Sequence, residues 1–232
     1  DQIRSALTAT GPDLLPVQDS TIRRAGYDAH LATIEDEMAA VIPLLANLGF
    51  YASTPEHDDL AVAAIRQLAS RPMELAGTNW LVKAQRYPAL LGLYALGLGA
   101  LANRRVRPLA RVLTEVVPKD NGQEVGLGYF LAPNHALEHD ALREMEEFTR
   151  HHTPASDRLH SRLRPHLSPF LPTEDDYDAA FDNLEYLIGL DAYRWSERWG
   201  PVGRFKWRRT YAERGVADQV LQLHLAELLD AG

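Results

Sequence analysis

The stretch YPALLGLYALGLGALA, from Tyr87 to Ala102, carries no charged residue over 16 positions. A membrane span needs about 18 to 20 apolar residues. This run is shorter, contains three glycines and is followed at once by Asn103, Arg104 and Arg105. A helix that is apolar on every side is typical of a protein core. We therefore predict that residues 87–102 form a fully buried central helix, against whose glycines another helix packs closely.

Apolar residues on both sides of this run recur every three or four positions, which is the pattern of helices that bury one face. Upstream, the pattern predicts a helix from residue 22 to Gly49 that kinks or breaks at Pro43. A second helix begins at Thr54-Pro55 and ends near Ser70. Downstream, helices are expected at 108–117, 133–152, 154–164, 173–200 and 217–229. The chain is therefore predicted to be all-α, an irregular bundle of about eight or nine helices.

Residues 118–133 depart from the helical pattern, because they contain three glycines next to the apolar group Tyr129-Phe130-Leu131. This composition predicts a short strand or a long loop. We expect residues 1–232 to form a single domain, and any subdivision would fall in this Gly-rich irregular segment.

Composition narrows the range of partners. The 232 residues include 32 acidic and 24 basic side chains, a formal net charge of −8, and no cysteine. This charge makes a nucleic-acid partner or an anionic membrane surface unfavourable. The lack of cysteine excludes a disulfide framework and a Cys-ligated metal centre, and it is compatible with a reducing cytosol. The chain starts at Asp1 without a signal peptide, so we expect a cytoplasmic piece of a longer protein.

The pattern H-x-x-E-H occurs once, at His135, Glu138 and His139. On a helix, the two imidazoles would share one face, and the glutamate would activate a metal-bound water. This arrangement makes a zinc-dependent hydrolase one alternative function, with zinc as its cofactor. A third ligand cannot be assigned from the sequence, and a solvated helix face explains the same residues. The favoured interpretation therefore includes no cofactor.

Arg24 and His30 have the spacing found in HEPN-type ribonucleases, which are helical domains that act on RNA phosphodiesters. In a chain with nine His and many Arg, about two or three such spacings arise by chance. A HEPN-like ribonuclease is the second alternative, and a pair of surface residues on a helix explains the spacing equally well.

Acidic residues gather after Thr173, at Glu174, Asp175 and Asp176 and further along the same helix. Acids in the first turn of a helix oppose its macrodipole, so we interpret them as capping residues rather than as a cation site. Asp191 interrupts the apolar stripe of this helix, and we expect it to pair with Arg194, Arg198 or a basic residue of the following segment.

The segment WGPVGRFKWRR, residues 199–209, alternates aromatic residues with fixed cations. Such alternation suits stacking and the recognition of phosphate or carboxylate groups. The candidate ligand or partner contacts are Trp199, Arg204, Phe205, Trp207 and Arg208. The alternative is that Phe205 and Trp207 pack on the helical core while the cations face water.

Four groups of residues carry a family resemblance: Trp80 with Tyr87 to Leu91 and Leu93 to Ala95; His152-Thr153-Pro154 with Ser156-Asp157-Arg158-Leu159; Phe181-Asp182 with Glu185-Tyr186-Leu187; and residues 199–205. In this combination the chain resembles the helical C-terminal region of large bacterial proteins whose N-terminal part is a SIR2-like or similar defence effector. The resemblance spans about residues 87 to 209 and includes no catalytic signature.

This resemblance implies a role in sensing, autoinhibition or assembly, and an association with antiphage defence. Its partner would be another protein or another domain of the same polypeptide. We therefore hypothesise a non-catalytic helical regulatory or protein-interaction module of a larger bacterial protein.

Overall fold

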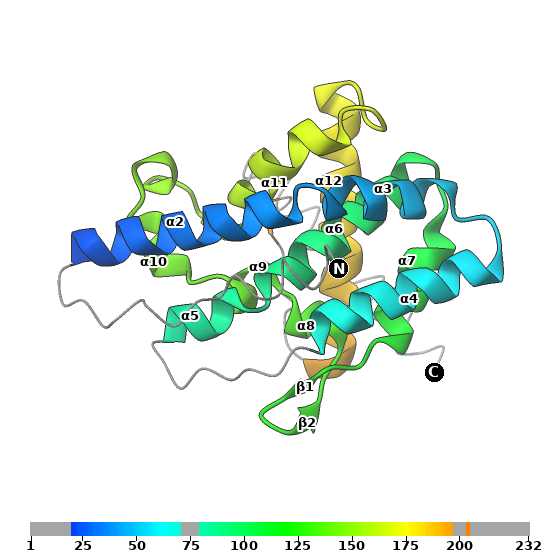
Figure 1. Ribbon diagram of the computed structural model, residues 1–232, viewed down its shortest axis with the longest axis horizontal. Helices are drawn as coiled ribbons and strands as arrows, with labels where there is room; N and C mark the ends of the chain where they lie inside the picture. The colour runs from blue at the N-terminus through cyan, green and yellow to red at the C-terminus, as the bar shows by residue number, and fades with distance from the viewer. Residues whose placement is uncertain (1–19, 71–78, 197–202, 205–232) are drawn as a thin grey trace, which may run out of the picture.

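The computed structural model describes residues 20–70, 79–196 and 203–204 (Figure 1). The helices are α2 (Ser20–Met38), α3 (Val41–Tyr51), α4 (Pro55–Ala69), α5 (Asn79–Ala84), α6 (Tyr87–Ala102), α7 (Val106–Glu115), α8 (Leu127–Phe130), α9 (Pro133–Ala136), α10 (His139–Arg143), the 3-10 helix η1 (Glu146–Phe148), α11 (Pro154–Leu167) and α12 (Glu174–Ser196). The only strands in these residues are β1 (Lys119–Asp120) and β2 (Gln123–Glu124). The predicted all-α fold is confirmed.

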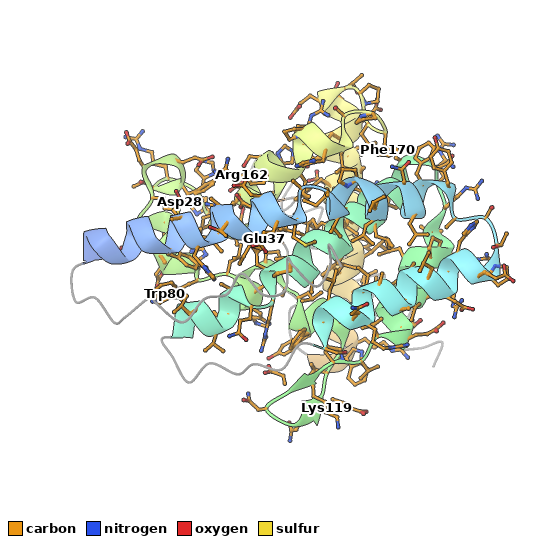
Figure 2. All side chains as sticks on the ribbon, viewed as in Figure 1. Asp28, Glu37, Trp80, Lys119, Arg162 and Phe170 are labelled. Carbon is orange, nitrogen blue, oxygen red and sulfur yellow. The ribbon has the colours of Figure 1, made fainter. Side chains whose placement is uncertain are left out.

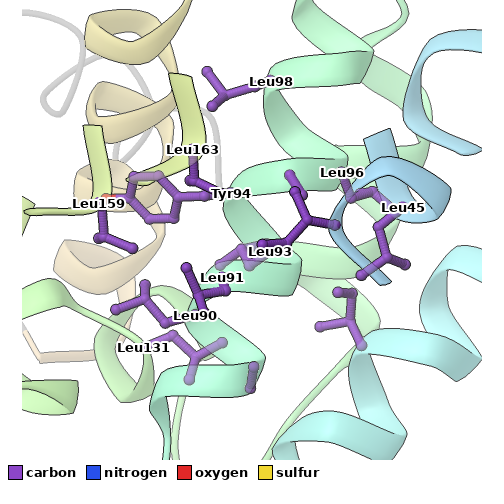
Figure 3. Packing of buried hydrophobic residues seen from close by; sticks show 14 of the residues in the cluster. Leu45, Leu90, Leu91, Leu93, Tyr94, Leu96, Leu98, Leu131, Leu159 and Leu163 are labelled. Atoms are coloured by element: carbon purple, nitrogen blue, oxygen red, sulfur yellow. The ribbon is translucent and has the colours of Figure 1, made fainter. Parts of the chain in front are cut away.

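Helix α6 lies at the centre of the bundle and contacts α2, α3, α4, α7, α11 and α12. Every residue from Tyr87 to Ala100 is buried. Leucines of α6 meet Leu45 of α3 on one side and Leu159 and Leu163 of α11 on another (Figure 3). The predicted buried central helix is confirmed. Within the described residues, no helix has both the length and the apolar character needed to cross a membrane.

The closest helix pair is α3 and α6, and two glycines make it possible. A Cβ atom on Gly99 of α6 would collide with the carbonyl oxygen of Ala46, and one on Gly49 of α3 would collide with that of Leu96. Because both carbonyl oxygens belong to the helix backbone, neither can move away by a change of rotamer. The prediction that a helix packs closely against the glycines of residues 87–102 is confirmed, and that helix is α3.

The helix predicted from residue 22 to Gly49 is two helices, α2 and α3. The break falls at residues 39–40, upstream of Pro43. Pro43 then lies in the first turn of α3, where its missing N–H removes no intrahelical hydrogen bond.

The Gly-rich segment contains the predicted short strand. Strands β1 and β2 form an antiparallel hairpin that pairs Lys119 with Glu124. Asn121 and Gly122 connect them with φ angles of 50° and 81°, the left-handed values that a tight two-residue hairpin turn requires. Leu113, before the hairpin, and Leu127, after it, belong to the same hydrophobic cluster.

The single helix predicted over 133–152 is wrong. Short pieces α9, α10 and η1 replace it, because the backbone is extended at Leu137 (φ −126°, ψ 148°) and Glu138 (φ −82°, ψ 110°). The side chain of Leu137 is fully buried, and the Glu138 N–H donates to the hydroxyl of Tyr27 at 3.0 Å. A distant tertiary partner thus satisfies an amide that a helix would have paired locally.

Candidate functional site

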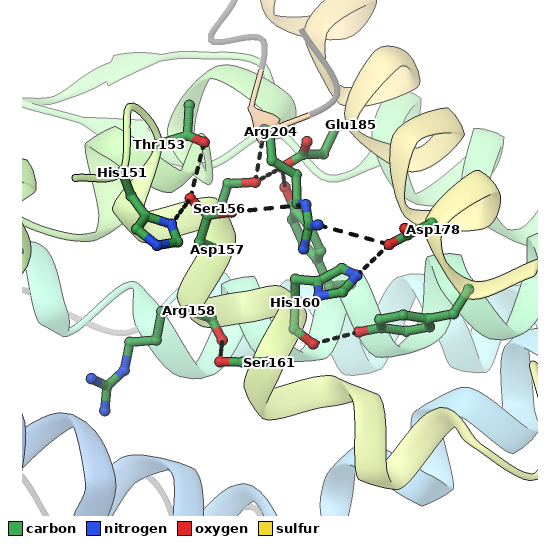
Figure 4. Close-up of polar contacts among 12 residues, drawn as sticks. His151, Thr153, Ser156, Asp157, Arg158, His160, Ser161, Asp178, Glu185 and Arg204 are labelled. Carbon is green, nitrogen blue, oxygen red and sulfur yellow. Dashed lines mark hydrogen bonds and ion pairs between the residues drawn. The ribbon is translucent and has the colours of Figure 1, made fainter. Parts of the chain in front are cut away.

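Helices α11 and α12 and the short stretch 203–204 bring together three of the groups that carry the family resemblance (Figure 4). Ser156 and Asp157 come from α11, and Glu185 comes from α12. Residue Arg204, after α12, returns to lie against both helices. We call Ser156, Asp157, His160, Asp178, Glu185 and Arg204 the Arg204 cluster.

A relay of buried hydrogen bonds anchors the backbone at Arg204. Its N–H donates to Ser156 Oγ at 3.0 Å, and the Ser156 hydroxyl donates to Glu185 Oε1. The Tyr94 hydroxyl of α6 donates to the same oxygen at 3.4 Å. At Gly203 a Cβ atom would collide with the Glu185 carboxylate. Ser156 and Glu185 are each 1% exposed, so this relay is shielded from water.

The guanidinium of Arg204 is held less tightly than its backbone. Its Nε lies 3.8 Å from Asp157 Oδ1, and its Nη2 lies 3.8 Å from Asp178 Oδ1. These distances exceed a hydrogen bond, so the guanidinium lies in the field of two carboxylates without bidentate contact to either. The side chain retains 17% exposure.

Each of these carboxylates also accepts shorter bonds. Asp157 Oδ2 is 2.9 Å from His151 Nδ1 and accepts from Thr153 Oγ1 at 3.3 Å. Asp178 Oδ1 is 2.7 Å from His160 Nε2. Each acid therefore has a closer partner than Arg204: His151 and Thr153, just before α11, for Asp157, and His160 of α11 for Asp178 of α12.

Within the described residues, one group of three side chains could hold a metal ion, with ligand atoms within 4.8 Å of one another: His160, Glu174 and Asp178. Arg164 Nε lies 3.0 Å from Glu174, and Arg204 lies beside Asp178. These two cations compete with a metal ion for the carboxylates. A protein-only network accounts for the group as it stands.

A second polar centre surrounds Arg158, whose side chain is fully buried. Its Nε and Nη2 donate to the two carboxylate oxygens of Glu35 at 2.7 and 3.2 Å, and its Nη1 donates to Asp28 at 2.7 Å. The Tyr87 hydroxyl donates to Glu35 at 2.6 Å. Burial, with the adjacent Glu35, raises the pKa of Tyr87, which keeps it a donor. Sequence reasoning placed Arg158 in the resemblance but did not recognise it as the link between α2, α6 and α11.

The H-x-x-E-H residues do not share a helix face. His135 lies in α9 and His139 in α10, with the extended Glu138 between them. His135 Nδ1 bonds to the Tyr129 carbonyl at 2.8 Å, and Glu138 pairs with Lys83 at 2.7 Å. The expectation that His135 and His139 share one helix face is therefore wrong, because the helix that would align them is interrupted at Leu137 and Glu138.

Other candidate residues fall partly outside the described structure. His30 is half-buried on α2, where burial lowers its pKa, while the side chain of Arg24 lies outside the described residues. Trp199, Phe205, Trp207 and Arg208 also lie outside them. Of the predicted contact segment, only Arg204 is placed.

The acids after Thr173 cap their helix as expected. The Asp176 N–H donates to Thr173 Oγ1 at 3.1 Å, and the threonine hydroxyl donates back to Asp176 Oδ2 at 2.6 Å. Thr173 thus pairs one of the backbone amides at the helix N-terminus, and Asp176 holds its hydroxyl in place.

Asp191 has a hydrogen-bond partner that we did not expect; of the expected cations, Arg194 interacts with it electrostatically and Arg198 lies outside the described residues. Asp191 Oδ2 accepts the Gly128 N–H of α8 at 2.7 Å, in a buried contact between α12 and α8. Burial raises the pKa of Asp191 to about 6 from its ordinary 3.8. Between these two values the folded state holds a proton that the unfolded state has released. The stabilising contribution is therefore fully present below the unfolded-state pKa and is lost as the pH rises through about 6.

We expect Asp191→Asn to weaken this pH dependence, because asparagine can accept the Gly128 N–H but does not ionise. As the pH rises from about 5 to about 8, the stability of the native protein relative to the variant should fall by about 1 to 2 kcal/mol. Urea denaturation at both pH values measures the difference. A difference that stays constant with pH would contradict a raised pKa at Asp191.

No protein-family model, curated protein sequence or solved structure matches this chain. The geometry of the chain itself is therefore the basis for assigning a function. Its most distinctive feature is the Arg204 cluster, where a backbone anchored by buried groups carries a partly exposed cation.

Proposed function

We propose that this chain is a non-catalytic helical regulatory or protein-interaction module of a larger bacterial protein, and that Arg204 belongs to its contact surface. The observation that carries the proposal is that the backbone of Arg204 is hydrogen-bonded to buried groups while its guanidinium is not closely paired. Its amide enters the buried relay through Ser156, whereas its guanidinium lies 3.8 Å from each neighbouring carboxylate.

This arrangement presents a cation at a fixed position without committing its N–H donors. A carboxylate or phosphate of a partner can form two parallel N–H···O bonds of about 2.7–2.9 Å with a guanidinium. Neither Asp157 nor Asp178 forms that pair. A partner anion therefore gains hydrogen bonds that Asp157 and Asp178 do not form with this guanidinium, while the relay to Glu185 keeps residues 203–204 in place.

The family resemblance supports another domain of the same polypeptide as the partner. Four of the six residues of the Arg204 cluster belong to the segments that carry the resemblance: Ser156, Asp157, Glu185 and Arg204. The partner we propose is an acidic surface on another domain of the same polypeptide, in a cytoplasmic protein associated with antiphage defence. No observation in the described residues favours the zinc hydrolase or the ribonuclease over this function.

We expect Arg204→Ala to weaken binding far more than folding. The region encoded upstream of Asp1 in the natural reading frame, expressed separately, is the binding partner for calorimetric titration. Loss of a bidentate pair should raise the Kd at least about tenfold. Two long, partly exposed ion pairs contribute little to folding, so the melting temperature should fall by only about 2 to 4 °C.

Arg143→Ala is the matched control, because it removes the same charge from an exposed position on α10. It should leave both the Kd and the melting temperature nearly unchanged. Loss of stability in proportion to loss of binding would assign Arg204 to packing. Failure of the upstream region to bind the unaltered chain, or a reading frame with a start codon directly before Asp1, would contradict the proposed module.

A further inference from the structure

A pocket of about 280 Å³ shares no residue with the Arg204 cluster, and four parts of the chain contribute to it. Its lining residues belong to α5 with the turn that follows it, to the β1–β2 hairpin, to α8 and to α9. Figure 1 shows where these elements lie in the bundle. The lining residues are Val82, Lys83, Arg86, Asp120, Asn121, Tyr129 and His135. Six of the seven carry polar side-chain atoms, so the pocket suits a polar ligand.

Two cations in the wall are held in place by acidic partners. Lys83 Nζ lies 2.7 Å from Glu138 Oε2, a contact that occupies one of the three N–H groups of the ammonium. Arg86 Nη2 donates to Asp120 Oδ1 at 2.8 Å, and its guanidinium lies 4.2 Å from the centre of the Phe130 ring. Each cation thus has one acidic partner, so the two ion pairs carry no net charge and the pocket offers the N–H groups that these partners leave over.

Arg86 also carries an unsatisfied donor. Its Nε is buried and has no hydrogen-bond partner among the described residues, while Nη1 reaches the Phe130 carbonyl only at 3.4 Å. Because Nε is buried, the donors that remain for an acceptor in the pocket are those of Lys83 Nζ and of Arg86 Nη1, whose own contact is long.

His135 contributes the opposite kind of group. Its Nδ1 lies 2.8 Å from the Tyr129 carbonyl oxygen, which can only accept, so Nδ1 carries the proton. Burial lowers the pKa of His135, and the ring is uncharged at neutral pH. Its Nε2 is then a hydrogen-bond acceptor. The edge-to-face contact with Tyr129, at 4.6 Å between ring centres, holds the ring in this orientation.

We propose that this pocket binds a small anionic molecule that also carries a hydroxyl group, of the class of sugar phosphates and hydroxycarboxylates. Lys83 and Arg86 bind the anionic end, and His135 Nε2 accepts from the hydroxyl. Both functional groups are required, because the cations recognise only acceptors and the neutral imidazole nitrogen recognises only a donor. This site is independent of the contact proposed at Arg204.

Calorimetric titration of the whole chain at neutral pH with glycerol 3-phosphate, lactate and sulfate tests the proposal. We expect one equivalent of glycerol 3-phosphate or of lactate to bind, and whichever binds more tightly identifies the anionic group. Sulfate, which carries no hydroxyl hydrogen at neutral pH, should bind more weakly. Lys83→Met should raise the Kd of the preferred probe at least tenfold, and His135→Phe should remove the advantage of that probe over sulfate.

Lys119→Met is the matched control, because Lys119 is an exposed lysine of the same hairpin that does not line the pocket (Figure 2). It should not change the Kd. An equal loss of affinity in the Lys83 and Lys119 variants would mean non-specific attraction and would overturn the proposal. The proposal would also fail if none of the three probes bound with a Kd below about 1 mM.

Because Lys83→Met also breaks a partly buried ion pair, a measurement on the unaltered protein is needed as well. Saturation with glycerol 3-phosphate or lactate should shift the ring proton resonances of His135 while those of His166, on α11, stay in place. Unchanged His135 resonances at saturation would place any binding elsewhere and would also refute the pocket.

Discussion

Replacing Arg158 with alanine should lower the free energy of unfolding by about 3 to 5 kcal/mol. The guanidinium is fully buried and makes a bidentate pair with Glu35, a carboxylate that is only 13% exposed. Without the arginine, this carboxylate keeps its burial and loses its closest cation, which is the costly way to break a buried ion pair. The aliphatic part of the side chain also leaves a void between α2, α6 and α11.

Arg162→Ala is the control for this prediction, because Arg162 lies one turn further along α11 and contacts the same Glu35 at 3.2 Å. Its side chain is 44% exposed, so water replaces its contacts and the expected loss is within about 1 kcal/mol. Figure 2 shows Arg162 and Asp28 beside α2. Urea denaturation of both variants measures the contrast. Equal losses would show that the burial of Arg158 does not determine its contribution.

Gly99→Ala should destabilise the protein by about 3 kcal/mol, even though alanine is the better helix former. The added methyl group would collide with the Ala46 carbonyl oxygen, and it would lie only 2.9 Å from the carbonyl carbon. To make room, α3 must move away from α6, and the leucines between the two helices then lose contact. Thermal or urea denaturation measures the effect.

Ala110→Gly, at an exposed position on α7, is the control for helix propensity alone. Because alanine is the better helix former, this substitution should cost about 1 kcal/mol. A loss of stability in both variants would support the close α3–α6 contact, since propensity alone favours alanine at both positions. A Gly99→Ala variant at least as stable as the native protein would contradict that contact.

The pattern of the sequence predicted much of the fold and little of the site. The run 87–102 predicted the central helix, because a helix without charged residues is stable in water only when it is covered on all sides. The capping pair of Thr173 and Asp176 was also predictable, since its members lie three residues apart. By contrast, the sequence indicated a contact segment around Arg204 only from its alternating cations and aromatic residues. It did not indicate that Ser156 and Asp178 would lie beside Arg204.

The helix break at Glu138 and the partner of Asp191 show why other features could not be predicted from local sequence. The Glu138 N–H bonds to Tyr27, which lies 111 positions away in the chain, and this bond accompanies an extended backbone where local periodicity indicated a helix. Asp191 bonds to Gly128 across 63 positions, whereas the sequence suggested only the nearby cations Arg194 and Arg198 or a basic residue of the following segment.

The sequence by itself determined that the run 87–102 is buried and where several helices begin and end, because periodicity and capping depend on neighbours within about one helical turn. Only the tertiary structure decided which polar groups meet: Arg158 with Glu35, Arg204 with Ser156, and His135 with the wall that holds Lys83. A buried polar group must find a partner, but helix packing determines which distant residue comes within reach.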